Sequence, residues 1–599
     1  MTSEIKKGFE NQAKVMGHPA GLFVLFFTEM WERFSYYGMR ALLVLFLVSA
    51  MGIGGWEWAR EDALYLYAIY TGLVYITPIF GGLIADKITG FRVAILIGAL
   101  LMTLGHASMA FETETTFYIG LGLLILGNGL FKPNISSVVG GLYKGNEDKK
   151  DAAYTIFYMG INAGAFLGIL LCGYVGEKAG WSYGFGLAGI FMLFGMIMYY
   201  YSKAIFTGLV EDGKPNNGNI ENNYDIADSI EEIKKKPLDK IAKDRLTVIG
   251  ILAFFTIFFW MAFEQAGGSM TIFAKDYTNR VLEGGWANFF TVINTIITIV
   301  PLAIITYVLF LLVKATFKKI PISNFFLSLS FLIIWGIVIW MVNKEFNTQA
   351  FKASYAAVAD NEDKGIKAGD VLFTDIRTDE KLMIDSKFIM LDVDQKGTYR
   401  FMSSKEAENL KPEQKIEATI TEIKDKEVEV PASWFGILNS LFIICFAPLF
   451  SKLWESKYNP SAPVKFALGL ILLGLGFGIL AAGSTGIELG AATASVSMVW
   501  LILAYLLHTL GELTLSPVGL SYVSKLAPEK LVGLMFGVWF GATALANYIA
   551  GWTGSYIDKI SEEIGLTGFF LIYTALPIVA GLILMAMNKF LLKKMHGIR

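Results

Sequence analysis

Four ionisable side chains lie inside one apolar stretch near the N-terminus. Glu29, Glu32, Arg33 and Arg40 occur within the hydrophobic run of residues 21–50. Each ionisable group at the centre of a membrane helix costs about 2.5–3.5 kcal/mol, so these four are tolerated only if they pair or face water. Their spacing of i, i+3, i+4 and i+11 places them on one face of a helix. The stretch therefore predicts one wall of a polar cavity inside a membrane protein.

The acidic side chains of this wall are suited to carrying protons. Burial raises the pKa of a carboxyl group and a nearby cation lowers it, so a carboxylate that changes partners can bind and release H⁺ near neutral pH. We expect Glu29 and Glu32 of this wall to carry protons, together with Glu264, which lies in the later hydrophobic run of residues 246–270. Arg33 and Arg40 are their cationic partners, and Glu264 is expected to leave Arg40 when it is protonated. For Glu29 and Glu32 the alternative is a permanent structural ion-pair cluster with Arg33.

Hydropathy predicts an all-α membrane protein that crosses the bilayer fourteen times. The 599 residues are 54% hydrophobic, and about 20 apolar helical residues cross the hydrocarbon core. Lysine and arginine gather in alternate connections, which places both termini in the cytoplasm. The expected location is a plasma membrane, the bacterial inner membrane. Runs of sufficient length lie near residues 21–50, 62–85, 91–111, 116–141, 153–176, 183–203, 246–270, 286–313, 322–343, 433–453, 463–484, 494–518, 531–556 and 566–592.

Composition argues against several other classes of protein. The net charge of −2 and the dispersed lysines form no basic patch, so no nucleic-acid partner is expected. Cys172 and Cys445 lie in apolar runs, so neither a disulfide framework nor a metal site is expected. No particular oligomeric state is predicted.

A polar segment at residues 344–430 lies outside the membrane in this orientation. Alternating apolar and polar residues in 387–393 and 415–423, with a turn at 394–397, predict a small β-rich module. A solvated spacer is the alternative. The polar segment 204–245 predicts a flexible cytoplasmic linker.

Several motifs resemble those of one transporter family. The first span contains ExxERFSYYG at residues 29–38, which resembles the signature of the proton-coupled oligopeptide transporters, a branch of the major facilitator superfamily. The connection at residues 81–92 resembles the loop signature of that superfamily. Further resemblances are Phe131–Asn134, Phe157–Gly164, Trp260–Gln265 and Gly511–Leu520.

The resemblance implies a fold of two six-helix bundles. Trp434–Ser440 resembles the start of the family's eighth helix, so an extra helix pair and the module are inserted between core helices seven and eight. Ser440 replaces a proline that is common there. The implied organisation is an N-terminal bundle at 1–203, the linker at 204–245, the first C-terminal helix at 246–270, two inserted membrane helices at 286–343, the module at 344–430 and the remaining C-terminal helices at 431–599.

The resemblance also implies a site for a zwitterionic peptide. Such a site must present opposite charges across a cavity. On the carboxylate side it implies Arg33, Lys132, Tyr37 and Tyr75, on the ammonium side Glu512, Asn162 and Asn439, and as apolar walls Trp260 and Trp539. Ordinary helix packing is the alternative for the two tryptophans.

Pairs of opposite charge are candidates for gating. By depth in the spans, Arg40 and Glu264 can bridge the bundles on the outer side of the site, and Lys132 and Glu512 on the inner side. Bridges that cannot persist together are what alternating access requires. The resemblance gives Asp86 and Arg92 a role in holding neighbouring helices in one conformation. His508 precedes Glu512 by one turn and is more simply a packing residue.

These features predict a proton-coupled symporter that imports di- and tripeptides, with protons as the coupling ion and no cofactor. The alternative with the same fold is a transporter of nitrate, amino acids or another small anion. A receptor or enzyme that works through the outer module is the rival from another class. The module has no nucleophile with an adjacent base and no histidines at metal-binding spacing, so no enzyme activity is expected.

Overall fold

The computed structural model describes residues 13–143, 149–206, 238–357, 360, 366–392, 399–402, 415–528 and 531–598. In these residues, thirteen long helices are apolar enough to cross a membrane. Helix α2, Ala20–Val48, is of similar length, and its charged side chains lie within its apolar stretch and not at its ends. Together they account for the fourteen predicted spans.

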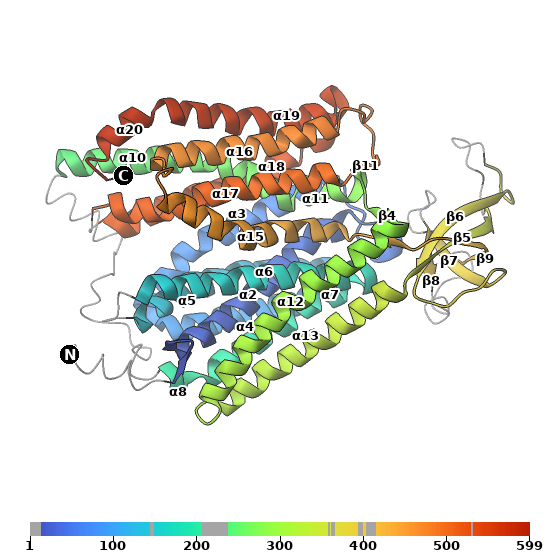
Figure 1. Ribbon diagram of the computed structural model, residues 1–599, viewed down its shortest axis with the longest axis horizontal. Coiled ribbons are helices and arrows are strands. Elements are labelled where there is room, and N and C mark those ends of the chain that lie inside the picture. The colour runs from blue at the N-terminus through green and yellow to red at the C-terminus, as the bar shows by residue number, and fades with distance from the viewer. Residues whose placement is uncertain are drawn as a thin grey trace.

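The first six long helices form one bundle (Figure 1). Its helices α2, α6 and α7 pack on one another, as do α4 and α5. A short helix α8, Lys203–Phe206, follows the bundle, and strands β1, Lys14–Val15, and β2, His18–Pro19, precede it. The other bounds are α3, Arg60–Ile84, α4, Phe91–Met109, α5, Glu114–Leu142, α6, Lys150–Ala179, and α7, Trp181–Tyr201.

The second bundle begins with α10, Lys240–Phe263, inside the range predicted as linker. The Asp239 side chain accepts a hydrogen bond from the main-chain N–H of Ala242 at 2.7 Å, which caps the helix at this earlier start. The rest of the predicted linker, residues 207–237, lies outside the described residues. The other bounds are α15, Ile437–Glu455, α16, Ala462–Gly483, α17, Val499–Leu526, α18, Val532–Gly554, α19, Ile557–Ala586, and α20, Asn588–Lys594. Helix α3 packs on α18 and joins the bundles.

Short elements continue the chain beyond α10 at one end of the bundles. They are η4, Glu264–Gly267, α11, Ser269–Ile272, η5, Phe273–Tyr277, and strand β3, Thr278–Asn279, which pairs in parallel with β11, Val496–Ser497. Strand β4, Val281–Glu283, then pairs antiparallel with β10, Glu427–Glu429. This two-stranded ribbon holds the beginning and the end of the insertion together. Turn η8, Ala432–Gly436, leads from it into α15.

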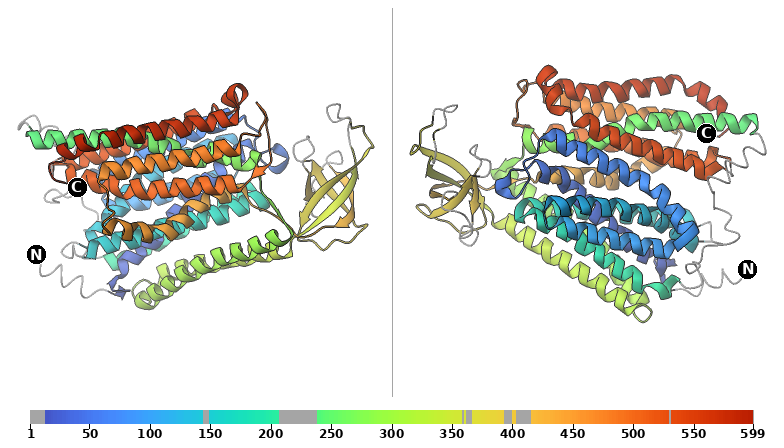
Figure 2. Two further views of the ribbon diagram at one scale, coloured as in Figure 1. Left: turned by 45° about the horizontal axis from the view of Figure 1, so that its top comes forward. Right: turned by 180° about the vertical axis from the view of Figure 1, so that it is seen from behind.

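The inserted helices α12, Gly284–Thr316, and α13, Pro321–Asn347, lie against the N-terminal bundle although they interrupt the C-terminal one (Figures 1 and 2). The ring of Phe331 on α13 contacts Phe27 and Trp31 of α2, with centroids 5.7 and 5.5 Å apart. The Ser323 hydroxyl donates to the carbonyl of Met198 on α7 at 2.8 Å. Helix α2 is therefore covered by protein on this side too, and its apolar residues Phe26, Met30, Phe34 and Leu45 are all buried.

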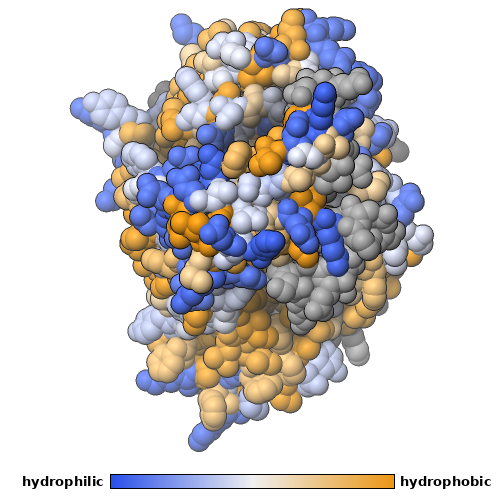
Figure 3. Space-filling view, turned by 90° about the vertical axis from the view of Figure 1, so that its right-hand side faces the viewer, coloured by the Kyte–Doolittle hydropathy of each residue, from blue (hydrophilic) through white to orange (hydrophobic). Residues whose placement is uncertain are grey.

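The predicted outer module is a five-stranded sheet in the order β6-β5-β9-β7-β8. Its strands are β5, Gln349–Ala356, β6, Val371–Thr378, β7, Lys387–Asp392, β8, Tyr399–Met402, and β9, Ile416–Ile423. Phe351, Met390 and Ile420 form its own small core. The predicted strands match β7 and β9, so the solvated-spacer alternative was wrong, and the predicted turn at 394–397 lies outside the described residues. Figure 3 shows hydrophilic residues over much of this end of the molecule and apolar ones below them. We call it the module end.

Candidate functional site

Helix α2 holds its first three charges in a sealed cluster inside the N-terminal bundle. Nε of Arg33 lies 3.0 Å from Oε1 of Glu29 and also pairs with Glu32. Nδ2 of Asn128 on α5 donates to the other oxygen of Glu32 at 3.0 Å. Glu29, Glu32 and Arg33 are each at most 3% exposed. The predicted clustering of these charges on one helix face is therefore present, and the cluster is shut off from solvent in this conformation.

The fourth charge of α2 bridges the two bundles. The Arg40 guanidinium pairs with the carboxylate of Glu264 on η4, and its Nε donates to the Tyr67 hydroxyl on α3 at 2.8 Å. The Tyr67 hydroxyl also donates to Glu264, at 3.4 Å. The structure thus forms the bridge that was predicted for the outer side of the site.

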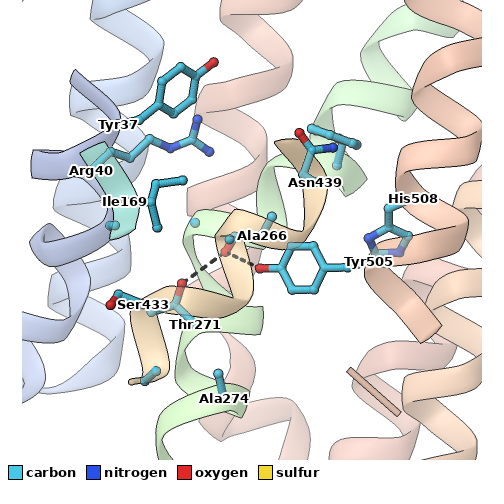
Figure 4. Close-up of a pocket in the computed structure, with 15 residues that line it drawn as sticks. Tyr37, Arg40, Ile169, Ala266, Thr271, Ala274, Ser433, Asn439, Tyr505 and His508 are labelled. Carbon is cyan, nitrogen blue, oxygen red and sulfur yellow. Dashed lines mark hydrogen bonds between the residues drawn. The ribbon is translucent and has the colours of Figure 1, made fainter. Parts of the chain in front are cut away.

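A cavity lies between the bundles next to this bridge. It encloses about 740 Å³, counting the part open to solvent. Tyr37 and Arg40 approach it from α2, and Tyr505 and His508 lie opposite on α17 (Figure 4). The Tyr505 and Thr271 hydroxyls both donate to the carbonyl of Ala266, at 3.3 and 3.0 Å, which fixes the irregular segment after α10 as part of the wall.

The predicted inner pair is not joined in this conformation. Nδ2 of Asn439, which also lines the cavity, donates to Glu512 at 2.9 Å and to Thr509 at 3.2 Å. Nζ of Lys132 lies over the Tyr75 ring, 4.3 Å from its centroid. Among the residues that the structure describes, no ion pair links Lys132 to Glu512.

The other predicted site residues are distributed around this centre. Asn162 donates to the carbonyl of Tyr158 in its own helix at 3.0 Å. Trp260 and Phe263 stack edge to face 5.3 Å apart, and Trp539 packs on Phe466 at 6.0 Å. Of the predicted substrate residues, Tyr37 and Asn439 line the described cavity.

The two residues predicted to hold helices together lie at the far end of the N-terminal bundle. Arg92 donates to the carbonyls of Tyr199 and Tyr200, at 3.3 and 2.8 Å, and so binds the C-terminal end of α7. Cations are favoured there by the helix dipole. Asp86 lies at the junction that leads into α4.

Sequence reasoning missed a second charged bridge at the module end. Arg60 on α3 contacts Asp276 and Asp558 of the C-terminal bundle, both at 2.8 Å, and donates to the Tyr277 hydroxyl at 2.9 Å. Arginine is uncommon in outer connections, so its position was the available signal. Of the ion pairs that the structure describes, those between the bundles all lie at the module end. The bundles are therefore closed against each other there.

No group of three or more His, Cys, Asp or Glu side chains within the described ranges could hold a metal ion. The site instead has side chains of opposite charge on the two bundles. Arg40 and Glu264 are paired across the boundary between them. Such an arrangement can bind a zwitterion between the bodies and can exchange ion-pair partners when the bodies move.

Comparison with known proteins gives a consistent picture. The POT family is matched over residues 92–230 and 416–570. The uncharacterized transporter YclF of Bacillus subtilis is 31% identical over 599 residues, which cover 99% of this chain and 97% of that protein. The peptide transporter YePEPT of Yersinia enterocolitica is 29% identical over 576 residues, which cover 95% of this chain and 94% of that protein. A crystal structure of a peptide transporter POT variant in complex with alafosfalin is similar with a TM-score of 0.68 at 26% identity, covering 100% of both chains.

Proposed function

Because this chain belongs to the POT family of membrane transporters, we propose that it is a proton-coupled symporter that imports di- and tripeptides by alternating access. The observation that carries the proposal is the Arg40–Glu264 pair, a buried bridge of opposite charge between two bundles beside a cavity. The peptide-transporting relatives support peptides as the substrates. We place the protein in a bacterial inner membrane with both termini in the cytoplasm.

The two bundles supply opposite charge for the two ends of a peptide. On the ammonium side, Glu512 and Asn439 are already joined on the C-terminal bundle, and α6 of the N-terminal bundle contributes Asn162. A carboxylate anchored at one end and an ammonium at the other fix the main chain and leave the side chains free, so Trp260 and Trp539 serve as apolar walls. This arrangement favours broad tolerance of side chains.

The carboxylate end of the peptide is assigned to cations of the N-terminal bundle. Lys132 lies over Tyr75 and has no ion-pair partner among the described residues, which leaves its charge available. Arg33 keeps Nη2 unpaired inside its closed cluster. A planar guanidinium binds a carboxylate through two parallel hydrogen bonds, so Arg33 joins the site once separation of the bundles uncovers it. Tyr37, on the wall of the cavity, is a further hydroxyl donor.

Proton coupling is assigned to the bridge at the module end. A proton on Glu264 removes the negative charge that holds Arg40, so the module end can open and admit peptide and H⁺ together. When the module end opens, the opposite, cytoplasmic ends of the bundles approach each other, which brings Lys132 toward Glu512. Each bridge stabilises one of the two conformations, and the ligands shift the population between them.

Uptake into proteoliposomes tests the proposal. With an imposed inward pH gradient, we expect a labelled dipeptide to accumulate and unlabelled di- and tripeptides to compete with it. Free nitrate and single amino acids are the alternative substrates, and they are not expected to compete because they cannot reach both charged ends of the site. Accumulation of nitrate instead, or uptake that is unaffected by collapsing the pH gradient, contradicts the proposal.

A further inference from the structure

A carboxylate at the module end of α6 holds the beginning of the C-terminal core helix against the N-terminal bundle. Glu177 accepts hydrogen bonds from the main-chain N–H groups of Ala432 and Ser433, both at 2.9 Å, and from the Ser433 hydroxyl. Ala432 and Ser433 are the first residues of η8, where the chain returns from the insertion to the C-terminal bundle. The contact therefore joins two bodies that must separate on this side when the protein opens outward.

The fit between α6 and this returning segment is close over more than two turns of helix. Nε1 of Trp434 donates to the carbonyl of Leu170 at 3.0 Å, and its ring stacks on Tyr174 with centroids 5.8 Å apart. A Cβ atom on Gly173 would lie 2.3 Å from the Ser433 hydroxyl oxygen. Glycine is required at this position for Ser433 to approach α6.

The same contact forms one wall of the cavity described above. Ala432, Ser433 and Gly436 line it from the C-terminal bundle, and Ile169 lines it from α6 (Figure 4). Asn439, one helical turn beyond Gly436, lines it too and holds Glu512. A displacement of η8 from α6 would therefore open the cavity and move a residue assigned to peptide binding.

We propose that Glu177 and Ala432–Trp434 form a return latch that closes the cavity on the module side and breaks each time the transporter opens outward. The inference rests on the proposed alternating access and adds a positioning residue, Glu177, that touches no substrate. Its partners are two backbone dipoles and one hydroxyl, so the latch responds to the position of η8 and not to protonation of a cationic partner. The segment that directly follows the insertion, at the start of the remaining C-terminal helices, thereby becomes part of the outer gate.

Accessibility of the cavity measures the latch without reference to substrate. In a Cys172→Ala, Cys445→Ser background, Ala41→Cys places a thiol on the cavity wall of α2. A membrane-impermeant maleimide is applied to intact cells. Hydrogen bonds to a charged group stabilise the conformation that is closed at the module end. Glu177→Gln and Ser433→Ala weaken these bonds, so each is expected to raise the labelling rate by about tenfold. Glu345→Gln removes a buried carboxylate that bonds only within the insertion and is expected to leave the rate unchanged.

The outcomes separate the latch from the transport function. Unchanged labelling in both Glu177→Gln and Ser433→Ala overturns the latch, even when the wild-type protein accumulates dipeptide. Raised labelling in a protein whose wild type fails to accumulate peptide supports the latch and overturns the proposed substrate. If Glu177→Gln does not reach the membrane, Ser433→Ala decides the matter, because it removes a single hydroxyl.

Discussion

Helix α2 carries two charge clusters that use the same chemistry in different ways. The cluster of Glu29, Glu32 and Arg33 is closed within one bundle, whereas Arg40 pairs with Glu264 of the other bundle. Motion of the bundles leaves the first set of contacts intact and must break the second. A buried ion pair within one bundle stabilises the local structure of that bundle. A similar pair between two bundles stabilises the conformation in which the bundles are in contact. The two clusters should therefore respond differently to the loss of one carboxylate.

Loss of a carboxylate within the sealed cluster should have the largest effect. Glu32→Ala leaves the buried Arg33 charge with Glu29 as its one remaining carboxylate partner in this cluster and leaves Nδ2 of Asn128 without the carboxylate oxygen that accepts from it. Removing one partner of a buried ion pair costs about 3–5 kcal/mol. We expect a lower yield of folded protein and a lower unfolding temperature in detergent. Neither proton-driven accumulation of peptide nor counterflow exchange is expected. A Glu32→Ala protein with wild-type thermal stability would show that the cluster is not the structural element we describe.

Loss of the carboxylate between the bundles should instead separate two transport modes. Glu264→Gln keeps the size of the side chain and removes the carboxylate to which we assign proton coupling, together with the charge that holds Arg40. Proton-driven accumulation is expected to fall to the level of equilibration, at least about tenfold below wild type, because the bridge no longer responds to H⁺. Counterflow exchange of labelled for unlabelled dipeptide should persist. Equal loss of accumulation and of counterflow would show that Glu264 is needed for the structure, as we expect of the sealed cluster, and would contradict the proposed difference between the two clusters.

Helical spacing predicted the cluster of Glu29, Glu32 and Arg33, and depth within the spans predicted the pair of Arg40 with Glu264. The sequence also predicted the strands around Lys387 and Ile416, since alternation of apolar and polar residues is a local property. It did not predict that the inserted helices cross to the N-terminal bundle. That placement depends on apolar contacts such as Phe331 with Trp31, and any of many apolar faces could have served.

The missed contacts have a common physical reason. Arg60 and Glu177 each find partners more than 200 residues away in the chain, through hydrogen bonds partly to main-chain atoms. A backbone N–H or carbonyl gives no sign of its identity in the sequence, so such partners emerge only from the fold. The pairing of Lys132 with Glu512 differs again, because the structure shows these residues with other partners and their pairing stays a prediction for a second conformation.

A hydrogen bond within the C-terminal bundle offers an intermediate case. Asn439 donates to Glu512 and lines the cavity, so Asn439→Ala removes a donor to a charged group without separating the bundles. We expect an increase of about tenfold in the apparent KM for dipeptide, with little change in thermal stability. Asn347→Ala removes an amide that bonds only Asn343 within the inserted helix α13, and it is the comparison variant. A fall in the maximal rate at unchanged KM would assign Asn439 to the conformational step and not to binding.

The smallest effect is expected for a partly exposed ion pair that joins the end of the insertion to the N-terminal bundle. Glu429 on β10 lies 3.3 Å from Lys178 of α6 and 3.0 Å from Arg280, and these cations lower its pKa to about 2. A carboxyl whose pKa is lowered by folding stabilises the protein above its unfolded pKa and loses that contribution as the pH falls toward the folded value. Solvent screening limits the contribution to about 1 kcal/mol or less.

Thermal unfolding of wild type and Glu429→Gln checks this contribution. Near pH 7 the wild type should unfold at a slightly higher temperature, and the difference should shrink as the pH falls from about 4.5 toward 2. Transport at neutral pH should change little, because the return latch at Glu177 still holds η8. A loss of transport as large as that of Glu264→Gln would show that exposed and buried bridges at the module end act as one unit, so that breaking either one opens the whole boundary.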